Sequence, residues 1–214
     1  MYQNILFDLD GTLVNSEEGI TTSVAQTLAE FGIKEEPQNL KCFIGPPLSR
    51  SFSMFYGFSE EQTEQAISVY RKYYSQKGIY LNRVYDGIET LLKKLKNEGK
   101  TIMLATSKYE LFAKQILSHI GFAKYFDFAA GSLEDSSRSE KKEVIAHILE
   151  TMDIRNLSET VMIGDRKHDI IGAKEIGIDS IGVLYGFGSK EELSSYGATH
   201  IAANTEEIFS LIMK

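Results

Sequence analysis

Only one of the 214 residues is a cysteine, Cys42, so the chain cannot form an internal disulfide bond. Structural disulfides are typical of secreted proteins, and a lone thiol suits a reducing compartment. The N-terminus also lacks the basic and then apolar pattern of a secretion signal, since its first apolar run, Ile5-Leu6-Phe7, is far too short. We therefore expect a cytoplasmic protein in which Cys42 is a small apolar filler.

Long apolar runs and basic patches are missing as well. No run approaches the roughly 20 apolar residues that a membrane-spanning helix needs. The formal net charge is −7 and the isoelectric point is about 5.2, with no basic stripe to attract phosphate backbones. We therefore expect neither a membrane nor a nucleic-acid polymer as a partner. The length and the 43% hydrophobic content suffice for a sizeable core with a small second unit.

Strand-like apolar runs recur along the chain, and helical patterns separate most of them. This alternation predicts an α/β fold with a doubly wound, Rossmann-like parallel sheet that has helices on both faces. The expected strands are Ile5–Phe7, Ile102–Ala105, Phe126–Ala130, Val161–Ile163, Ile181–Leu184 and His200–Ala202, and the expected helices include Gly87–Asn97, Glu110–Ile120, Lys141–Met152 and Asp169–Ile176.

One segment, residues 15–80, contains no convincing strand. Ser59-Glu60-Glu61-Gln62 has the pattern of a helix capping box, and Ala66, Tyr70 and Tyr74 recur on one helical face behind it. We therefore expect residues 15–80 to form a small all-helical domain inserted into the core that residues 1–14 and 81–214 build.

Carboxylates follow two of the expected strands. Asp8 and Asp10 come directly after the first strand, Asp165 follows Val161–Ile163, and Asp169 lies where the next helix opens. Ligands of open α/β sheets bind outside the carboxyl ends of the strands, and carboxylates this close together favour a bound cation or a shared proton. An all-oxygen ligand set favours a hard divalent ion, and Mg²⁺ fits it best.

Four motifs occur along the chain in the same order as in a known family, and the resemblance that they carry spans nearly the whole chain. Asp8-Leu9-Asp10-Gly11-Thr12, and Gly164-Asp165-Arg166 with Asp169, resemble the first and last motifs of the haloacid dehalogenase superfamily. An apolar strand that ends at Thr106 resembles the second motif, and Lys141 at a helix start resembles the third. The segments Gly45-Pro46-Pro47-Leu48 and Tyr185-Gly186-Phe187-Gly188 are similar to phosphoglycolate-phosphatase-like members, and the second could form a flexible loop beside the site.

The resemblance implies hydrolysis of a phosphate monoester through a covalent intermediate, with residues 15–80 as a cap over the active site. Asp8 is the implied nucleophile, which becomes an aspartyl-phosphate. Asp10 is the implied general acid and base, which protonates the leaving alcohol and then deprotonates the attacking water. The dehalogenase branch lacks this second aspartate, so its presence favours phosphoryl transfer.

The resemblance also implies a metal and a phosphate site. Asp8, Asp165 and the main-chain carbonyl of Asp10 would hold Mg²⁺, with Asp169 in the outer shell or on a water ligand. Phosphate binding is implied for Thr106, which ends the second motif, for Ser107 directly after it, and for Lys141 of the third motif.

Several positions leave alternatives open. Successive helix residues point 100° apart, so only one of Lys141 and Lys142 can face the site, and the motif selects Lys141. Ser107 stands where relatives usually carry Asn, which affects how the phosphate is oriented. Arg50 and Lys108 are candidates for substrate recognition, although Arg50 could equally form a surface salt bridge.

The expected substrate is a small phosphorylated metabolite, with a phosphoglycolate-phosphatase-like activity as the first choice. A nucleoside 5′-monophosphatase is the closest alternative, and hexose phosphomutases also carry helical caps of this kind. A receiver-type signalling domain shares the acceptor aspartate, the Mg²⁺, the hydroxyl and the lysine, but it is about half this length and lacks the insertion. We expect a monomer or a weak homodimer.

Overall fold

The computed structural model describes residues 1–135 and 137–214, which form two compact units. The first unit contains Met1–Asn15 and Val84–Lys214, and the second contains Ser16–Arg83. No helix in the described part of the chain is long and apolar enough to cross a membrane.

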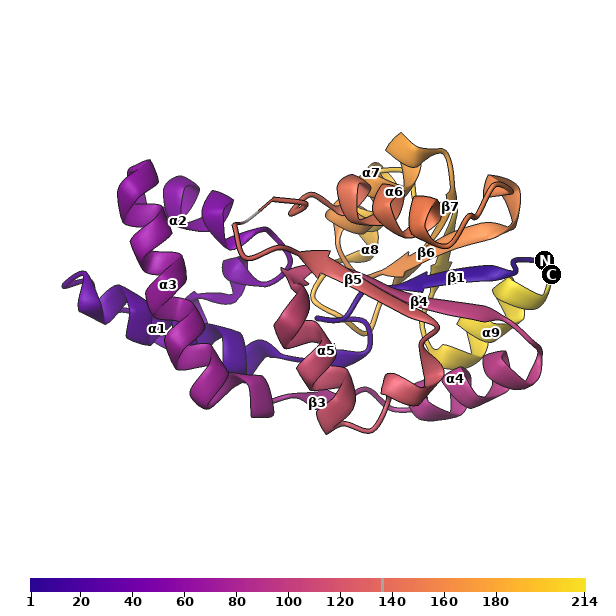
Figure 1. The fold of residues 1–214 in the computed structure, drawn as a ribbon, viewed down its shortest axis with the longest axis horizontal. Coiled ribbons are helices and arrows are strands. Elements are labelled where there is room, and N and C mark those ends of the chain that lie inside the picture. Colours follow the sequence, from indigo (N-terminus) through magenta and orange to yellow (C-terminus); the bar gives the residue numbers. More distant parts are fainter. Residues whose placement is uncertain (136) are drawn as a thin grey trace. The chain divides into compact units, whose positions relative to one another are not determined.

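A six-stranded parallel sheet forms the centre of the first unit (Figure 1). The first strand of the chain lies inside the sheet, the next two strands of the sheet are added in turn on one side of it, and the last three are added in turn on the other side. The predicted doubly wound α/β fold is thereby confirmed, and the strand order reverses between β1 and β6. Across the sheet the strands are β5 (Phe128–Ser132), β4 (Thr101–Tyr109), β1 (Asn4–Phe7), β6 (Thr160–Gly164), β7 (Asp179–Val183) and β8 (His200–Ala202).

Helices cover both faces of this sheet, which is why its central strands are apolar on both sides. Ile5, Leu6 and Phe7 of β1 are all fully buried. On one face lie α6 (Lys141–Thr151) and α7 (Lys167–Ile176). On the other face lie α4 (Ile88–Asn97), α5 (Glu110–His119) and α9 (Thr205–Met213), while the short α8 (Lys190–Ser195) packs on β8 and α7.

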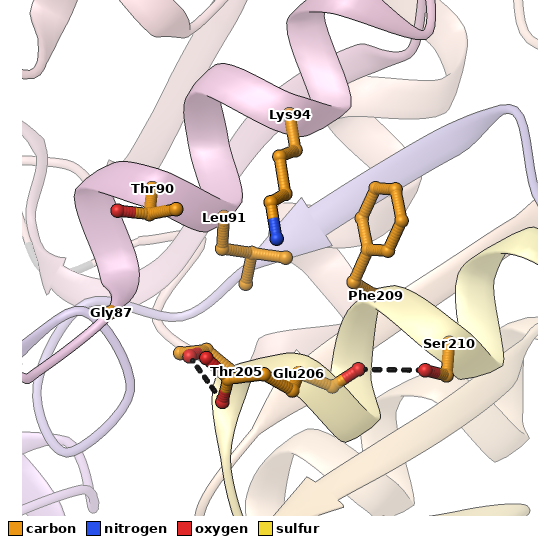
Figure 2. A pocket seen from close by; sticks show the side chains of 8 residues that line it. All are labelled: Gly87, Thr90, Leu91, Lys94, Thr205, Glu206, Phe209 and Ser210. Carbon is orange, nitrogen blue, oxygen red and sulfur yellow. Dashed lines mark hydrogen bonds between the residues drawn. The ribbon is translucent and has the colours of Figure 1, made fainter.

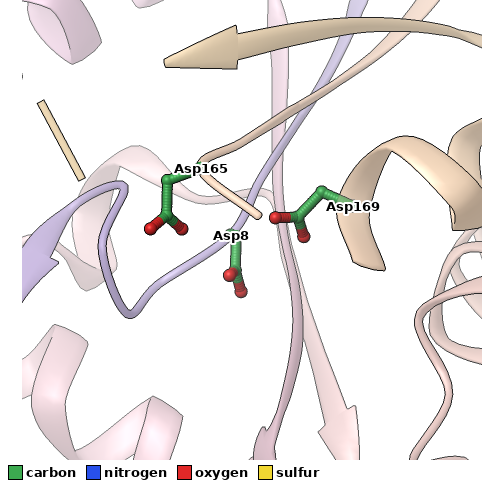
Figure 3. A group of neighbouring side chains, drawn as sticks. All are labelled: Asp8, Asp165 and Asp169. Atoms are coloured by element: carbon green, nitrogen blue, oxygen red, sulfur yellow. The ribbon is translucent and has the colours of Figure 1, made fainter. Parts of the chain in front are cut away.

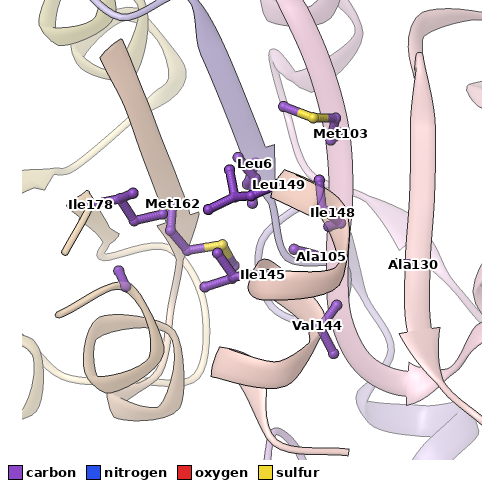
Figure 4. Packing of buried hydrophobic residues seen from close by; sticks show 11 residues of the cluster. Leu6, Met103, Ala105, Ala130, Val144, Ile145, Ile148, Leu149, Met162 and Ile178 are labelled. Carbon is purple, nitrogen blue, oxygen red and sulfur yellow. The ribbon is translucent and has the colours of Figure 1, made fainter. Parts of the chain in front are cut away.

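A cluster of buried aliphatic side chains joins α6 to the sheet (Figure 4). Leu6, Met103 and Met162 of the strands meet Ile145 and Ile148 of α6, and all five are fully buried. Full burial of each such side chain contributes about 1.5–3 kcal/mol. This layer therefore fixes α6, whose first residue is Lys141, against the strand ends.

The second unit consists of α1 (Glu17–Glu30), α2 (Leu48–Tyr56), α3 (Glu60–Gln76) and three short 3₁₀ helices, at Pro37–Asn39, Lys41–Phe43 and Gly78–Tyr80. The capping box of α3 is present, because Ser59 Oγ accepts from the N–H of Gln62 and Gln62 Oε1 accepts from the N–H of Ser59. Ala66, Tyr70 and Tyr74 of α3 are buried. That this unit acts as a cap stays a prediction.

Two features differ from the sequence expectations. A two-residue strand pair, β2 (Val14–Asn15) and β3 (Arg83–Val84), forms a small separate sheet that no sequence pattern indicated. Cys42 is exposed instead of filling a core position, because the short 3₁₀ helix at Lys41–Phe43 buries Phe43.

Candidate active site

Three carboxylates converge where β1 and β6 end (Figure 3). Asp8 directly follows β1, Asp165 directly follows β6, and Asp169 lies in the first turn of α7. The two strands pair in parallel as far as Phe7 and Ile163, and the N–H of Asp8 donates to the Ile163 carbonyl at 2.9 Å. Each aspartate offers one oxygen, and these oxygens all lie within 4.8 Å of one another.

Burial makes this cluster electrostatically costly. The side chains of Asp8, Asp165 and Asp169 are almost fully withdrawn from solvent. Burial, with smaller contributions from the charges of Asp169 and Asp10, raises the pKa of Asp8 to about 6 against the lowering effect of Lys141. Burial also raises the pKa of Asp165 well above its ordinary value, with added repulsion from Asp169 and Asp8. Keeping these carboxylates ionised while they are buried and close to one another requires a compensating cation.

Lys141 supplies part of that compensation. It is buried, and its Nζ lies 2.8 Å from Oδ1 of Asp8 and 2.8 Å from Oδ1 of Asp169, while it donates to the Ala105 carbonyl at 2.8 Å. Burial alone would lower the pKa of Lys141, but the charges of Asp169 and Asp8 outweigh it and hold that pKa above its ordinary value. The neighbouring Lys142 is exposed and pairs with Glu175 at 3.4 Å. Of the two lysines, the structure therefore turns Lys141 towards the acidic cluster.

The ionised cluster has a charge that suits a divalent metal. Three carboxylates and one ammonium sum to −2, and the available ligand atoms are oxygens, which hard divalent cations prefer. The residues present therefore fit such an ion, which Asp8, Asp165 and Asp169 would hold.

A tight turn after β1 brings Thr12 and Gly11 against Asp165. The N–H groups of Thr12, Leu13 and Val14 all point to the Leu9 carbonyl, at 3.0–3.3 Å. Gly11 has a φ of +85°, and a Cβ at this residue would lie 2.1 Å from Oδ2 of Asp165. Only glycine fits here, because it adopts positive φ at no steric cost and leaves room for the carboxylate.

The loop after β7, which the sequence predicted beside the site, also contacts Asp165, and this contact was not anticipated. The N–H of Phe187 donates to Asp165 Oδ2 at 2.7 Å, and the hydroxyl of Tyr185 donates to the Thr12 carbonyl at 3.1 Å. Tyr185 also packs on Tyr85, with ring centroids 5.0 Å apart. The glycines at 186 and 188 are the sequence feature that could have indicated this contact. Both approach the backbone or side chain of Asp165 too closely for a Cβ.

Asp10 lies beside this cluster but has a different partner. Lys108 Nζ donates to both carboxylate oxygens of Asp10, at 3.1 and 3.0 Å. The hydroxyl of Thr106, at 2% exposure, accepts from the N–H of Lys108 at 3.3 Å, and Ser107 is half-buried. The structure therefore brings Asp8, Asp165, Asp169 and Lys141 together. It also pairs Asp10 with Lys108, whose N–H contacts Thr106. Arg50 lies on α2 of the other unit, where it is exposed.

A separate pocket of about 180 Å³ lies between α4 and α9 (Figure 2). Lys94 extends over the ring of Phe209, with its Nζ 5.5 Å from the centroid. The pocket shares no lining residue with the acidic cluster, so it does not belong to that site. It is lined by Gly87, Thr90, Leu91, Lys94, Thr205, Glu206, Phe209 and Ser210.

The family of the chain follows from its sequence as well as from this geometry. Residues 5–183 match the family model of haloacid dehalogenase-like hydrolases. The chain therefore belongs to that family of hydrolases.

Individual relatives indicate which kind of hydrolase the protein is. A 5′-nucleotidase of Pseudomonas aeruginosa is 45% identical over 204 residues, which are 95% of this chain and 92% of that protein. A phosphoglycolate phosphatase of Vibrio parahaemolyticus is 28% identical, covering 97% of this chain and 95% of that protein. The crystal structure of a predicted phosphatase from Clostridium acetobutylicum superposes with a TM-score of 0.96 at 47% identity, covering 100% of this chain and 99% of that one. Within its family the protein is a phosphatase, a hydrolase of phosphate monoesters.

Proposed function

We propose that the protein is a Mg²⁺-dependent hydrolase of small phosphate monoesters that works through an aspartyl-phosphate on Asp8. The convergence of three buried carboxylates beside one buried lysine, at the switch point of the sheet, is the observation that supports this proposal most directly. Mg²⁺ bound there would offset the negative charges of the nucleophile and of the phosphate, which otherwise repel each other.

In the first half of the proposed reaction, a carboxylate oxygen of Asp8 forms a bond to phosphorus and the bond from phosphorus to the alcohol oxygen breaks. Asp10 gives a proton to that leaving oxygen. In the second half, a water molecule gives a proton to Asp10 and attacks the same phosphorus. The bond between phosphorus and Asp8 then breaks, and inorganic phosphate and the free carboxylate are restored.

Lys141 and Thr106 serve the phosphoryl group in this proposal. The ammonium of Lys141 already lies 2.8 Å from Asp8, where it favours the ionised form that attacks phosphorus. Negative charge spreads over the phosphoryl oxygens during transfer, and a fixed cation and a hydroxyl donor stabilise it without having to reorganise. The burial of both side chains keeps water from weakening these interactions.

Two substrate classes compete within this proposal. The sequence motifs favour a small acid such as phosphoglycolate. The 45% identity to a 5′-nucleotidase favours nucleoside 5′-monophosphates, and it extends over 95% of the chain. Family membership alone does not settle the substrate.

A substrate panel tests the proposal. Phosphate release is measured for phosphoglycolate, nucleoside 5′-monophosphates, hexose phosphates and pyrophosphate, each with Mg²⁺ and with EDTA. We expect Mg²⁺-dependent release from at least one monoester. Release without a bisphosphate activator argues against a phosphomutase.

Two variants test the assigned roles. We expect Asp8→Asn to abolish turnover, and Asp10→Asn to slow it by about 10²–10⁴-fold, the usual contribution of a general acid or base. Asp86→Asn is the matched control, because Asp86 is an exposed aspartate of the same unit outside the cluster. Full turnover by Asp8→Asn, or equal turnover with EDTA, would contradict the proposal.

A further inference from the structure

Asp10 and Lys108 form a buried ion pair that is separate from the three-carboxylate cluster. Lys108 Nζ meets both oxygens of Asp10, and the two side chains are only 8% and 11% exposed. Lys141 meanwhile contacts Asp8 and Asp169. The site thus contains two buried lysines, each with its own carboxylate partners.

An irregularity in β4 directs Lys108 towards Asp10. The strand pairs regularly with β5 up to Ala105 and Ala130, and its register shifts before Tyr109 pairs with Ser132. Such bulges turn a side chain away from the direction that a regular strand would give it, and they are common beside active sites.

The backbone of Lys108 is held in place from two sides. Its N–H donates to Thr106 Oγ1 at 3.3 Å. Its carbonyl oxygen lies so close to Gly131 that a Cβ there would come within 2.4 Å. Lys108 is therefore anchored through its main chain, and its side chain ends at Asp10.

Each half of the proposed reaction requires the Asp10 carboxyl group at a defined place, first beside the leaving oxygen and then beside the attacking water. Small displacements of a proton-transfer group reduce rates strongly. A contact to both carboxylate oxygens restricts rotation of that group more than a single hydrogen bond does.

We propose that Lys108 is a positioning residue that acts on Asp10 and does not itself bind the substrate. This inference rests on the proposed function of Asp10 as general acid and base. It replaces the expectation, made from its place after the second motif, that Lys108 recognises substrate.

The leaving group provides a specific readout. An alkyl alcohol is a poor leaving group and needs a proton as its bond to phosphorus breaks, whereas p-nitrophenolate leaves without one. The parameter kcat/KM reports steps up to the first irreversible one, which is formation of the phosphoenzyme. Loss of Lys108 should therefore lower kcat/KM for an alkyl phosphate far more than for p-nitrophenyl phosphate.

The experiment compares Lys108→Met, Lys108→Arg, Asp10→Asn and the Asp10→Asn/Lys108→Met double variant in the full chain with Mg²⁺. For Lys108→Met we expect a loss of about 10- to 100-fold in kcat/KM for the alkyl phosphate, part of a general-acid effect, and only a few-fold loss for the aryl phosphate. We expect partial rescue by Lys108→Arg. Inhibition by inorganic phosphate should be unchanged, and Lys108→Met should cost nothing further when Asp10 is already Asn.

The control is Lys93→Met, which removes an exposed lysine that pairs with Glu89 on α4. We expect its activity to equal that of the wild type. Circular dichroism verifies folding, and Lys108→Gln is the second neutral variant if Lys108→Met does not fold.

Other outcomes separate the two proposals. Three results together would show that Lys108 binds substrate. Lys108→Met would lower kcat/KM equally for both substrates, inhibition by phosphate would weaken, and the loss in the double variant would equal the sum of the two single losses in free energy. Wild-type activity in Lys108→Met beside an impaired Asp10→Asn would overturn the positioning role alone. Full activity of Asp10→Asn would overturn the proposed function of Asp10 and this inference with it.

Discussion

The backbone N–H of Phe187 donates a hydrogen bond of 2.7 Å to Oδ2 of Asp165. This contact depends on the glycine before it. A Cβ at residue 186 would lie 2.3 Å from the carbonyl oxygen of Gly11 and 2.4 Å from the Cβ of Asp165. The loop therefore orients a carboxylate that we propose as a metal ligand, and contacts of this kind tune metal affinity.

Gly186→Ala should weaken metal binding without abolishing the fold. We expect the Mg²⁺ concentration for half-maximal activity to rise by about 10- to 100-fold, the usual effect of disturbing a group that orients a ligand. Gly121→Ala is the control. Gly121 has a φ of +74° and open space around it, so its substitution costs about 1–2 kcal/mol of stability and should leave the Mg²⁺ requirement unchanged. An unchanged Mg²⁺ requirement in Gly186→Ala would refute this role of the loop.

Lys141→Met and Lys142→Met should differ strongly, although the two residues are adjacent. Lys141→Met leaves the carboxylates of Asp8 and Asp169 buried without their cation, which costs about 3–5 kcal/mol. Lys142 and Glu175 are about half exposed, so Lys142→Met should change stability by no more than about 0.5 kcal/mol. Urea unfolding without metal measures both free energies, and equal losses would contradict the prediction.

The contribution of Asp8 to the stability of the metal-free protein should fall as the pH rises. The pKa of Asp8 is about 6 in the folded protein and 3.8 for an unperturbed aspartate, so the folded state binds more protons between these values. This contribution is fully present below pH 3.8 and is lost as the pH rises through about 6, with about 1.4 kcal/mol for each unit of pKa difference. Asp8→Asn removes it. In EDTA, the stability of wild type relative to Asp8→Asn should therefore fall from pH 4 to pH 7, and a constant difference would contradict the shift.

Mg²⁺ should stabilise the folded protein through the acidic cluster. A ligand that binds only the folded state adds about 2.7 kcal/mol at one hundred times its dissociation constant. We expect Tm to rise with Mg²⁺ concentration in the wild type and in Asp86→Asn, and to respond little in Asp165→Asn, whose ligand set is incomplete. A similar rise in Asp165→Asn would place the metal elsewhere. This measurement does not depend on knowing the substrate.

The sequence predicted the sheet because apolar strands that alternate with helices have few packing solutions. The proximity of Asp8 and Asp165 could be anticipated in the same way, since each directly follows a strand of one parallel sheet. The position of Asp169 beside them could also be predicted, because this residue lies at the start of the helix that follows the second of these strands. Their catalytic roles stay predictions.

Contacts that depend on irregular backbone could not be anticipated. The pairing of Lys108 with Asp10 follows a register shift in β4 that leaves no local sequence signal. The Phe187 contact uses a main-chain N–H, which every residue except proline possesses. The strand pair β2–β3 involves only two residues from each segment, too few for an alternation pattern.

Residues 16–83 have an aromatic core of their own. The rings of Phe43 and Phe52 lie 5.1 Å apart, and those of Phe52 and Phe58 lie 5.7 Å apart in a stacked arrangement. The aliphatic layer around α6 belongs wholly to the other unit. Mutations that remodel one interior need not disturb the other. Natural variation can therefore diversify the inserted segment among relatives while the acidic constellation stays intact.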